Sequence, residues 1–123
     1  MTKGSNDTAE VPHPIRDASV IDTVVTTDRG AYYGLVIASP VSGDVASQER
    51  LLNKISAYIG DFHSEGYISR FGKPSMESCQ ITVGIHPKSD PIIFELLGKC
   101  KAWVEDNNIR FVVKTDILGQ VSH

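Results

Sequence analysis

The sequence predicts an α+β protein, a two-layer sandwich in which two helices cover one face of a four-stranded mixed sheet. Three observations predict this fold. The elements follow the order β-β-α-β-α-β, one strand alternates cleanly between apolar and polar residues, and two helices carry apolar stripes with helical spacing. Each strand-helix-strand step should cross over right-handed, which leaves both helices on the same face and gives the sheet order 1-2-3-4. The other sheet face is then uncovered.

The first two strands are expected to form a β-hairpin. Residues 19–28 and 31–39 are both rich in β-branched and aromatic residues, which favour strands. Arg29 and Gly30 separate them, and Gly30 is expected to supply the positive φ that a tight hairpin turn needs.

The first helix shows the clearest periodicity in the chain. Its predicted buried stripe consists of Leu51, Leu52, Ile55, Tyr58, Ile59 and Phe62. Ser47 is the expected N-cap, and Gly66 is the expected stop at the C-terminal end. Residues 67–77 are expected to be irregular, with room for a short extended piece.

The second half of the chain predicts a strand, a helix and a last strand. Residues 78–86 alternate strictly, as in a strand with one buried face. Asp90 and Pro91 fit the N-cap and the first position of a helix, and Asn107-Asn108 fits its end. Residues 109–115 form the last predicted strand. The predicted buried stripe of this helix consists of Ile93, Leu96, Leu97, Cys100 and Val104.

Length and composition predict one domain. The chain has 123 residues, of which 41% are hydrophobic and 22% charged, as in an ordinary globular protein. We expect residues 1–18 to be a flexible N-terminal tail, residues 19–116 the domain, and residues 117–123 a C-terminal tail. The N-terminus has no apolar signal-peptide core, and no apolar run approaches the length of a membrane span. The sequence therefore favours a cytoplasmic protein without a membrane partner.

Charge and cysteine usage exclude several function classes from the prediction. The formal net charge is −3, and this acidic balance argues against a nucleic-acid partner. Cys79 and Cys100 have no ligand-like spacing and fall on core-facing positions, and His63 has no second histidine at metal-ligand spacing. We therefore expect no metal and no cofactor. No set of catalytic residues can be assigned, so the sequence leans against an enzyme.

One candidate site is a small-ligand site centred on His86. This residue ends a strand just before a helix, where α/β proteins often place ligand groups. Lys88 and Ser89 are close enough in sequence to join it, beside the free backbone N–H groups of the helix N-terminus. A small-ligand binder or small enzyme at this junction is the alternative prediction for function.

The uncovered sheet face is the other candidate, and it is the favoured one. The residues expected on this face are Val20, Val24, Tyr32, Val36, Arg110 and Lys114. The N-terminal tail or residues 67–77 could cover this face, but an apolar cluster of this kind also marks a protein contact. We therefore predict a non-enzymatic interaction module that binds itself or another protein. In size and charge it is similar to toxin-neutralising immunity proteins.

The layout also resembles a family of small bacterial proteins that is catalogued as a domain of unknown function. The similarity lies in the helix that begins Leu51-Leu52-Asn53-Lys54 and reaches Ser64-Glu65-Gly66, in Val20-Ile21-Asp22 at the first strand, and in Asn108-Ile109-Arg110-Phe111. It covers roughly residues 20–115. The resemblance implies this fold and a bacterial origin, and it implies no activity.

Overall fold

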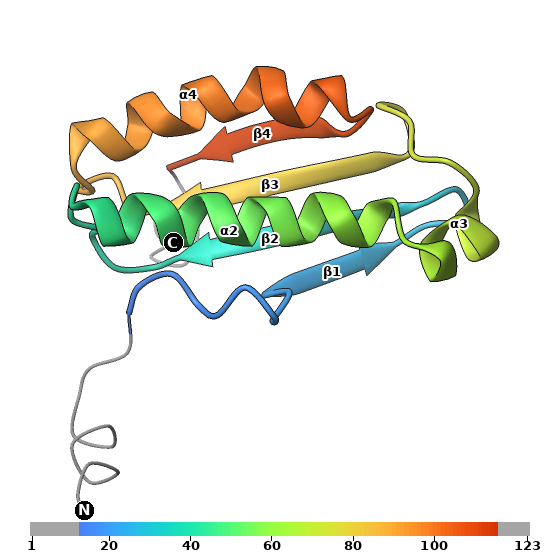
Figure 1. Ribbon diagram of the computed structural model, residues 1–123, viewed down its shortest axis with the longest axis horizontal. Helices are drawn as coiled ribbons and strands as arrows, with labels where there is room; N and C mark the ends of the chain where they lie inside the picture. Colours follow the sequence, from blue (N-terminus) through green and yellow to red (C-terminus); the bar gives the residue numbers. More distant parts are fainter. Residues whose placement is uncertain (1–12, 116–123) are drawn as a thin grey trace, which may run out of the picture.

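The computed structural model describes residues 13–115, in which helices pack against one face of a four-stranded sheet (Figure 1). The predicted tail at 117–123 and most of the predicted tail at 1–18 lie outside the described residues. The elements in chain order are β1 (Thr23–Thr26), β2 (Ala31–Ile37), α2 (Val45–Phe62), α3 (Glu65–Phe71), β3 (Cys79–Ile85), α4 (Pro91–Asp106) and β4 (Arg110–Lys114).

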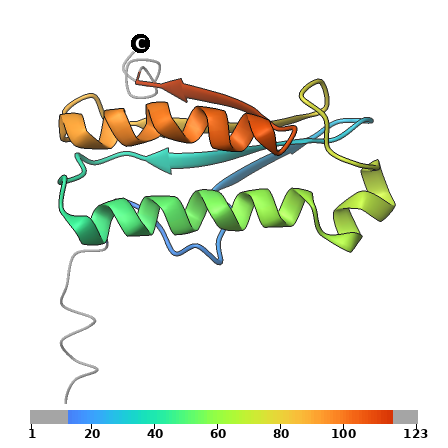
Figure 2. The same ribbon diagram turned by 45° about the horizontal axis from the view of Figure 1, so that its top comes forward.

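The sheet has the order β1-β2-β3-β4, as the sequence predicts. β1 runs antiparallel to β2, while β2, β3 and β4 are parallel to one another. The two long helices α2 and α4 lie next to each other on the same side of the sheet (Figure 2). The predicted α+β class, the mixed sheet and the one-sided helical layer are therefore confirmed. A third, short helix is added to them.

The predicted ends of the first helix are wrong at both positions. α2 begins at Val45, because the Asp44 carboxylate accepts a hydrogen bond from the backbone N–H of Ser47 at 3.2 Å and so acts as the N-cap. The helix ends at Phe62, before Gly66. Ser64 then caps a new helix, α3, by accepting from the N–H of Tyr67 at 3.2 Å. Residues expected to be irregular are therefore helical up to Phe71.

The hairpin is confirmed, but Gly30 is required for a different reason from the one predicted. The glycine with positive φ in the described chain is Gly72, at 88°, and not Gly30. A Cβ atom on Gly30 would lie 2.2 Å from the backbone oxygen of Ser78. Gly30 is therefore needed because β2 begins against another backbone segment, not because the turn is left-handed.

The second helix and the core follow the predicted stripes closely. Asp90 caps α4 by accepting from the N–H of Ile92 at 2.9 Å, and Pro91 opens the helix as expected. Asn108 takes the left-handed conformation after the helix end, with φ of 64°. Every residue of the two predicted stripes is buried except Leu52 and Leu96, which are partly buried against the core.

The folded domain begins earlier than predicted. Ile15 is completely buried in the core, although it falls in the segment expected to be a flexible tail. Its carbonyl oxygen accepts a hydrogen bond from Arg50 Nε on α2, and the His13 ring lies 3.2 Å from the Ser47 hydroxyl. The segment 13–18 therefore contacts α2 through His13 and Ile15.

A buried polar network holds the chain where it enters β1. Lys54 Nζ on α2 lies 2.9 Å from Asp22 Oδ1 and donates to the backbone oxygen of Asp17 at 3.0 Å. The second oxygen of Asp22 accepts from the N–H of Val36 at 2.9 Å, so the carboxylate continues the β1–β2 ladder. The Tyr58 hydroxyl accepts from the N–H of Asp22 and donates to the oxygen of Gly34. β1 is therefore fixed from one end by α2.

No helix within residues 13–115 combines the length and the apolar character needed to cross a lipid bilayer.

Candidate interaction surface

The uncovered sheet face carries side chains in three rows that cross the strands. The first row is Val25, Tyr32, Gln80 and Arg110. The second is Thr23, Gly34, Thr82 and Val112, and the third is Val36, Gly84 and Lys114. The face is therefore apolar beside β1 and cationic along β4.

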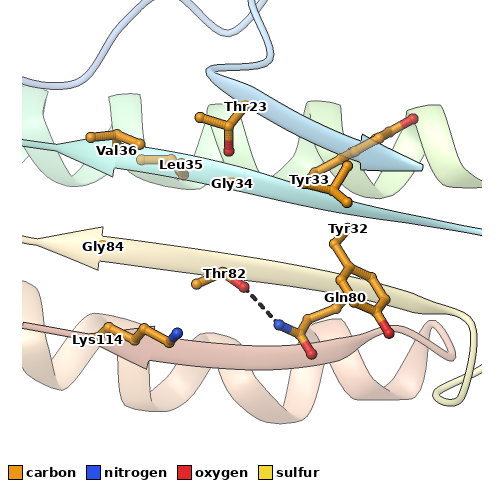
Figure 3. A pocket seen from close by; sticks show the side chains of 11 residues that line it. Thr23, Tyr32, Tyr33, Gly34, Leu35, Val36, Gln80, Thr82, Gly84 and Lys114 are labelled. Carbon is orange, nitrogen blue, oxygen red and sulfur yellow. Dashed lines mark hydrogen bonds between the residues drawn. The ribbon is translucent and has the colours of Figure 1, made fainter. Parts of the chain in front are cut away.

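An open hollow of about 310 Å³ lies in the middle of this face (Figure 3). Its base includes Gly34 and Gly84, and the Thr23 side chain stands so close that a Cβ atom on Gly34 would lie 2.0 Å from Thr23 Oγ1. Gln80 Nε2 donates to Thr82 Oγ1 at 2.8 Å, so these two polar groups already satisfy each other. Apolar residues of β1 and β2 and Lys114 of β4 both line the hollow.

Val24 is not on the uncovered face, so this part of the predicted surface is wrong. The hairpin pairs Val24 with Tyr33, whose side chain is buried in the core, and Val24 therefore points to the helix side. Val25 takes the predicted place on the uncovered face, opposite Tyr32. Even-numbered residues of β1 pair with odd-numbered residues of β2, so Val24 and Tyr32 lie on opposite faces of the sheet. A one-residue change of register would move every β1 side chain to the opposite face.

Val20 is also misplaced by the prediction, because it precedes β1 and lies outside the sheet. Its N–H donates to the oxygen of Asp17 at 3.0 Å, in a turn that leads to the strand. The other four predicted residues, Tyr32, Val36, Arg110 and Lys114, do lie on the uncovered face.

β1 forms an exposed edge of the sheet. Within residues 13–115, the only strand that pairs with β1 is β2, and all four residues of β1 are exposed. Val24 and Val25 are 49% and 58% exposed. The edge sequence Thr-Val-Val-Thr has no charge and no proline, which are the usual devices that keep an edge strand from pairing.

A second hollow, of about 350 Å³, lies on the helix side of this same edge, which we call the α3 hollow. Val24 and Thr26 of β1 form one wall, and α3 forms another with Gly66, Tyr67, Arg70 and Phe71. Ala31, Tyr33, Asp61 and Ser64 complete the lining. Figure 1 shows α3 beside the hairpin end of β1 and β2. The α3 hollow therefore adjoins the exposed edge strand.

The polar groups at the α3 hollow are partly satisfied within the chain. The Tyr33 hydroxyl donates to Asp61 Oδ2, and the guanidinium of Arg70 lies 4.7 Å from the centre of the Phe71 ring. Burial, together with the neighbouring Asp61 carboxylate, raises the pKa of Tyr33 well above its ordinary value. Tyr33 therefore stays a hydrogen-bond donor at neutral pH, and its partner Asp61 places a carboxylate in the lining of the hollow.

His86, Lys88 and Ser89 lie in the loop before α4, which is hydrogen-bonded to the loop after β2. His86 Nδ1 accepts from the N–H of Lys88 at 3.1 Å, and the buried Ser89 hydroxyl accepts from the N–H of Val41 at 3.1 Å. The N–H of Asp90 donates to the oxygen of Val41 at 2.9 Å, so the loop before α4 is tied to the loop after β2. Neither hollow described above includes His86, Lys88 or Ser89.

Both cysteines are buried free thiols, in agreement with the predicted core positions. Burial raises the pKa of Cys100 to about 11, which keeps it protonated and unreactive at neutral pH. The Sγ atom of Cys79 lies 3.2 Å from the Tyr67 hydroxyl. Among residues 13–115, no three His, Cys, Asp or Glu side chains are grouped so that they could hold a metal ion.

The sequence reasoning missed Val25 and the α3 hollow. Val25 was missed because the sequence predicts that Val24, and not Val25, shares the uncovered face with Tyr32. The hollow was missed because it depends on α3, and the sequence predicts that the first helix continues to Gly66, whereas α3 begins at Glu65. A Ser followed by an acidic residue is an N-terminal signal that could have revealed it.

Comparisons with protein-family models, with curated proteins and with solved structures find no match to this chain. The resemblance to small bacterial proteins of unknown function stays a prediction.

Proposed function

We propose that this protein is a non-enzymatic interaction module that self-associates by pairing its β1 edge with the β1 edge of a second copy. The observation that carries the proposal is the exposed, uncharged edge formed by Thr23–Thr26. Antiparallel pairing of two such edges would join the two four-stranded sheets into one continuous sheet.

Among residues 13–115, no strand pairs with the side of β1 that points away from β2, and backbone polar groups of β1 point to that side. Bonded and non-bonded residue pairs alternate along an antiparallel ladder. The N–H of Thr27 donates to Gly30 at 2.8 Å, which makes this pair a bonded one. Counting back along the register, Thr23 and Val25 bond to β2, while Val24 and Thr26 direct their N–H and C=O groups outward. Each copy therefore offers four polar groups to a partner strand.

One register of a two-fold dimer uses all of these groups. When the axis passes beside Val25, Val24 of each copy bonds to Thr26 of the other, and the two Val25 side chains face each other on the uncovered face. The N–H of Asp22 cannot extend this ladder, because it already donates to the Tyr58 hydroxyl. The Val25 and Tyr32 side chains of both copies would then form one apolar strip across the joined sheet.

Charge favours this edge over the other edge and over stacking of the two uncovered faces. The opposite edge strand, β4, begins and ends with Arg110 and Lys114, and such charges at an edge oppose pairing. In the proposed dimer the two β4 strands lie at the outer margins, about 34 Å apart at the usual strand spacing. Face-to-face stacking would instead bring the cations of both copies into one interface.

The experiment is light scattering and sedimentation across a concentration series. Val25→Lys places a charge at the edge and should convert the dimer to a monomer. Val36→Lys is the matched control, because Val36 lies on the same face but on β2, away from the edge. It should leave the edge-paired dimer intact.

Three results would contradict the proposal. A wild-type protein that is monomeric throughout the concentration series would rule out self-association. Loss of the dimer in Val36→Lys but not in Val25→Lys would assign association to the sheet face instead. A wild-type monomer that acquires a β1-edge partner of different sequence would show that the edge serves another protein.

A further inference from the structure

We propose that the α3 hollow is the socket for the Val24 side chain of the second copy. This inference rests on the proposed edge pairing and adds to it a specific receptor site on the helix side of the sheet. Pairing of the two backbones would not by itself involve the α3 hollow.

The place of Val24 follows from the register. In the dimer centred on Val25, the partner's Val24 lies opposite Thr26, and residues paired across an antiparallel ladder point to the same side of the sheet. Val24 and Thr26 both line the α3 hollow from β1. The partner's Val24 would therefore project on the helix side, directly beside Thr26 and at the mouth of the hollow. The two-fold symmetry makes the same contact twice.

The chemistry of the hollow suits an aliphatic side chain. Ala31 and the aromatic residues Tyr33, Tyr67 and Phe71 are part of the lining, and the Tyr33 hydroxyl is already engaged with Asp61. Val24 is 49% exposed in the single copy, although it is a β-branched aliphatic residue. Insertion into the hollow would remove most of this apolar area from water.

The size of a stable interface supports the same arrangement. A ladder between two four-residue strands buries far less than the roughly 1,200 Å² at which specific, stable interfaces begin. Further contact must come from structure next to the strand, and α3 adjoins it, because residues of α3 line the hollow together with Val24 and Thr26. The joined edges would need this additional apolar contact to form a lasting dimer.

Charge at the ends of the contact is complementary. The exposed turn that begins at Asp17 leads directly into β1, and its carbonyl is fixed by Lys54. The two-fold axis reverses the strand direction, so this turn would lie at the α3 end of the other copy. The exposed Arg70, which lines the α3 hollow, lies at that end. Asp17 and Arg70 carry opposite charges, which favours this orientation of the two copies.

The test fills the socket without touching the edge strand. Gly66 lines the α3 hollow, and a Cβ atom added there meets nothing within 4 Å, so Gly66→Leu should fold normally. Gly60→Leu is the matched control, since Gly60 is also an open helical position but does not line the hollow. We expect Gly66→Leu to raise the dimer dissociation constant at least about tenfold relative to Gly60→Leu.

Val24→Ala supplies an independent measurement, because it removes the inserted group but keeps the backbone ladder. It should weaken the dimer by a similar factor, while circular dichroism shows an unchanged fold. If Val25→Lys abolishes association but Gly66→Leu and Val24→Ala associate as tightly as the wild type, the socket is wrong and the edge pairing stands. If the wild type does not associate through β1, both proposals fail together, and Val25→Lys reveals that case.

Discussion

Lys54 Nζ lies 2.9 Å from Asp22 Oδ1, and the two side chains are 0% and 1% exposed to solvent. The pair links α2 to the residue that precedes β1. Because the other Asp22 oxygen accepts from Val36, the ion pair also completes the ladder between β1 and β2. The position of the edge strand, and hence of the proposed interface, depends on this buried pair.

Lys54→Met should therefore destabilise the protein by about 3–5 kcal/mol, because it leaves the buried Asp22 carboxylate without its cation. Urea unfolding measures the loss. The matched control is Lys101→Met, which removes an exposed pair with Glu105 on α4 and should cost about 0.5 kcal/mol or less. Equal losses in the two variants would contradict the assigned role of Lys54. Addition of Asp22→Asn to Lys54→Met should recover part of the stability.

Stability should fall at alkaline pH through the buried phenols. Burial raises the pKa of Tyr58 to about 12, against an ordinary value of 10.0. The folded state therefore holds this proton more tightly than the unfolded state. The stabilising contribution of Tyr58 is fully present below about pH 10 and is lost as the pH rises toward about 12.

Urea unfolding as a function of pH, for the wild type and for Tyr58→Phe, tests this dependence. Tyr58→Phe should be less stable at neutral pH, by about 1 kcal/mol for each of its two lost hydrogen bonds. Its stability should decline less steeply than that of the wild type in the alkaline window. Parallel curves for the two proteins would show that Tyr58 is not among the groups responsible.

Two glycines should respond in opposite ways to alanine. Gly30→Ala forces a Cβ atom to 2.2 Å from the backbone oxygen of Ser78, so we expect a loss of about 1–3 kcal/mol. Gly98→Ala on α4 meets nothing within 4 Å and should stabilise the helix by up to about 1 kcal/mol. Thermal unfolding of both variants measures the difference. A neutral Gly30→Ala would mean that β2 and the Ser78 backbone can separate freely.

The sequence was sufficient for the fold because periodicity and element order determine most of it. The stripe that includes Leu51 and Ile55, and the alternation from Cys79 to Ile85, each match a single secondary structure. Two parallel crossovers of the usual hand then place both helices on one face. The short helix α3 was not predicted, because seven residues give too little periodicity to identify it.

The site was less predictable, since it depends on pairings that are distant in sequence. The face on which Val24 lies is decided by the hairpin register, and the sequence around Gly30 does not fix that register. Lys54 follows Leu51 by three residues and precedes Tyr58 by four, which puts it on the buried stripe. Its charge is typical of a surface residue. A lysine at a stripe position is the signal that could have indicated a buried carboxylate partner.

The early start of the domain leads to a last prediction, at Ile15. This side chain is fully buried, so Ile15→Ala should destabilise the protein by about 2–5 kcal/mol. Val20→Ala is the control, because Val20 is 42% exposed and its truncation should cost about 0.5 kcal/mol or less. Hydrogen exchange should show the reason. Loss of the Ile15 contact should release the segment that Arg50 and Lys54 hold along α2, and the Val36 amide, which donates to Asp22, should exchange faster. An Ile15→Ala variant as stable as Val20→Ala would instead place the boundary of the folded domain after residue 18, as the sequence alone had predicted.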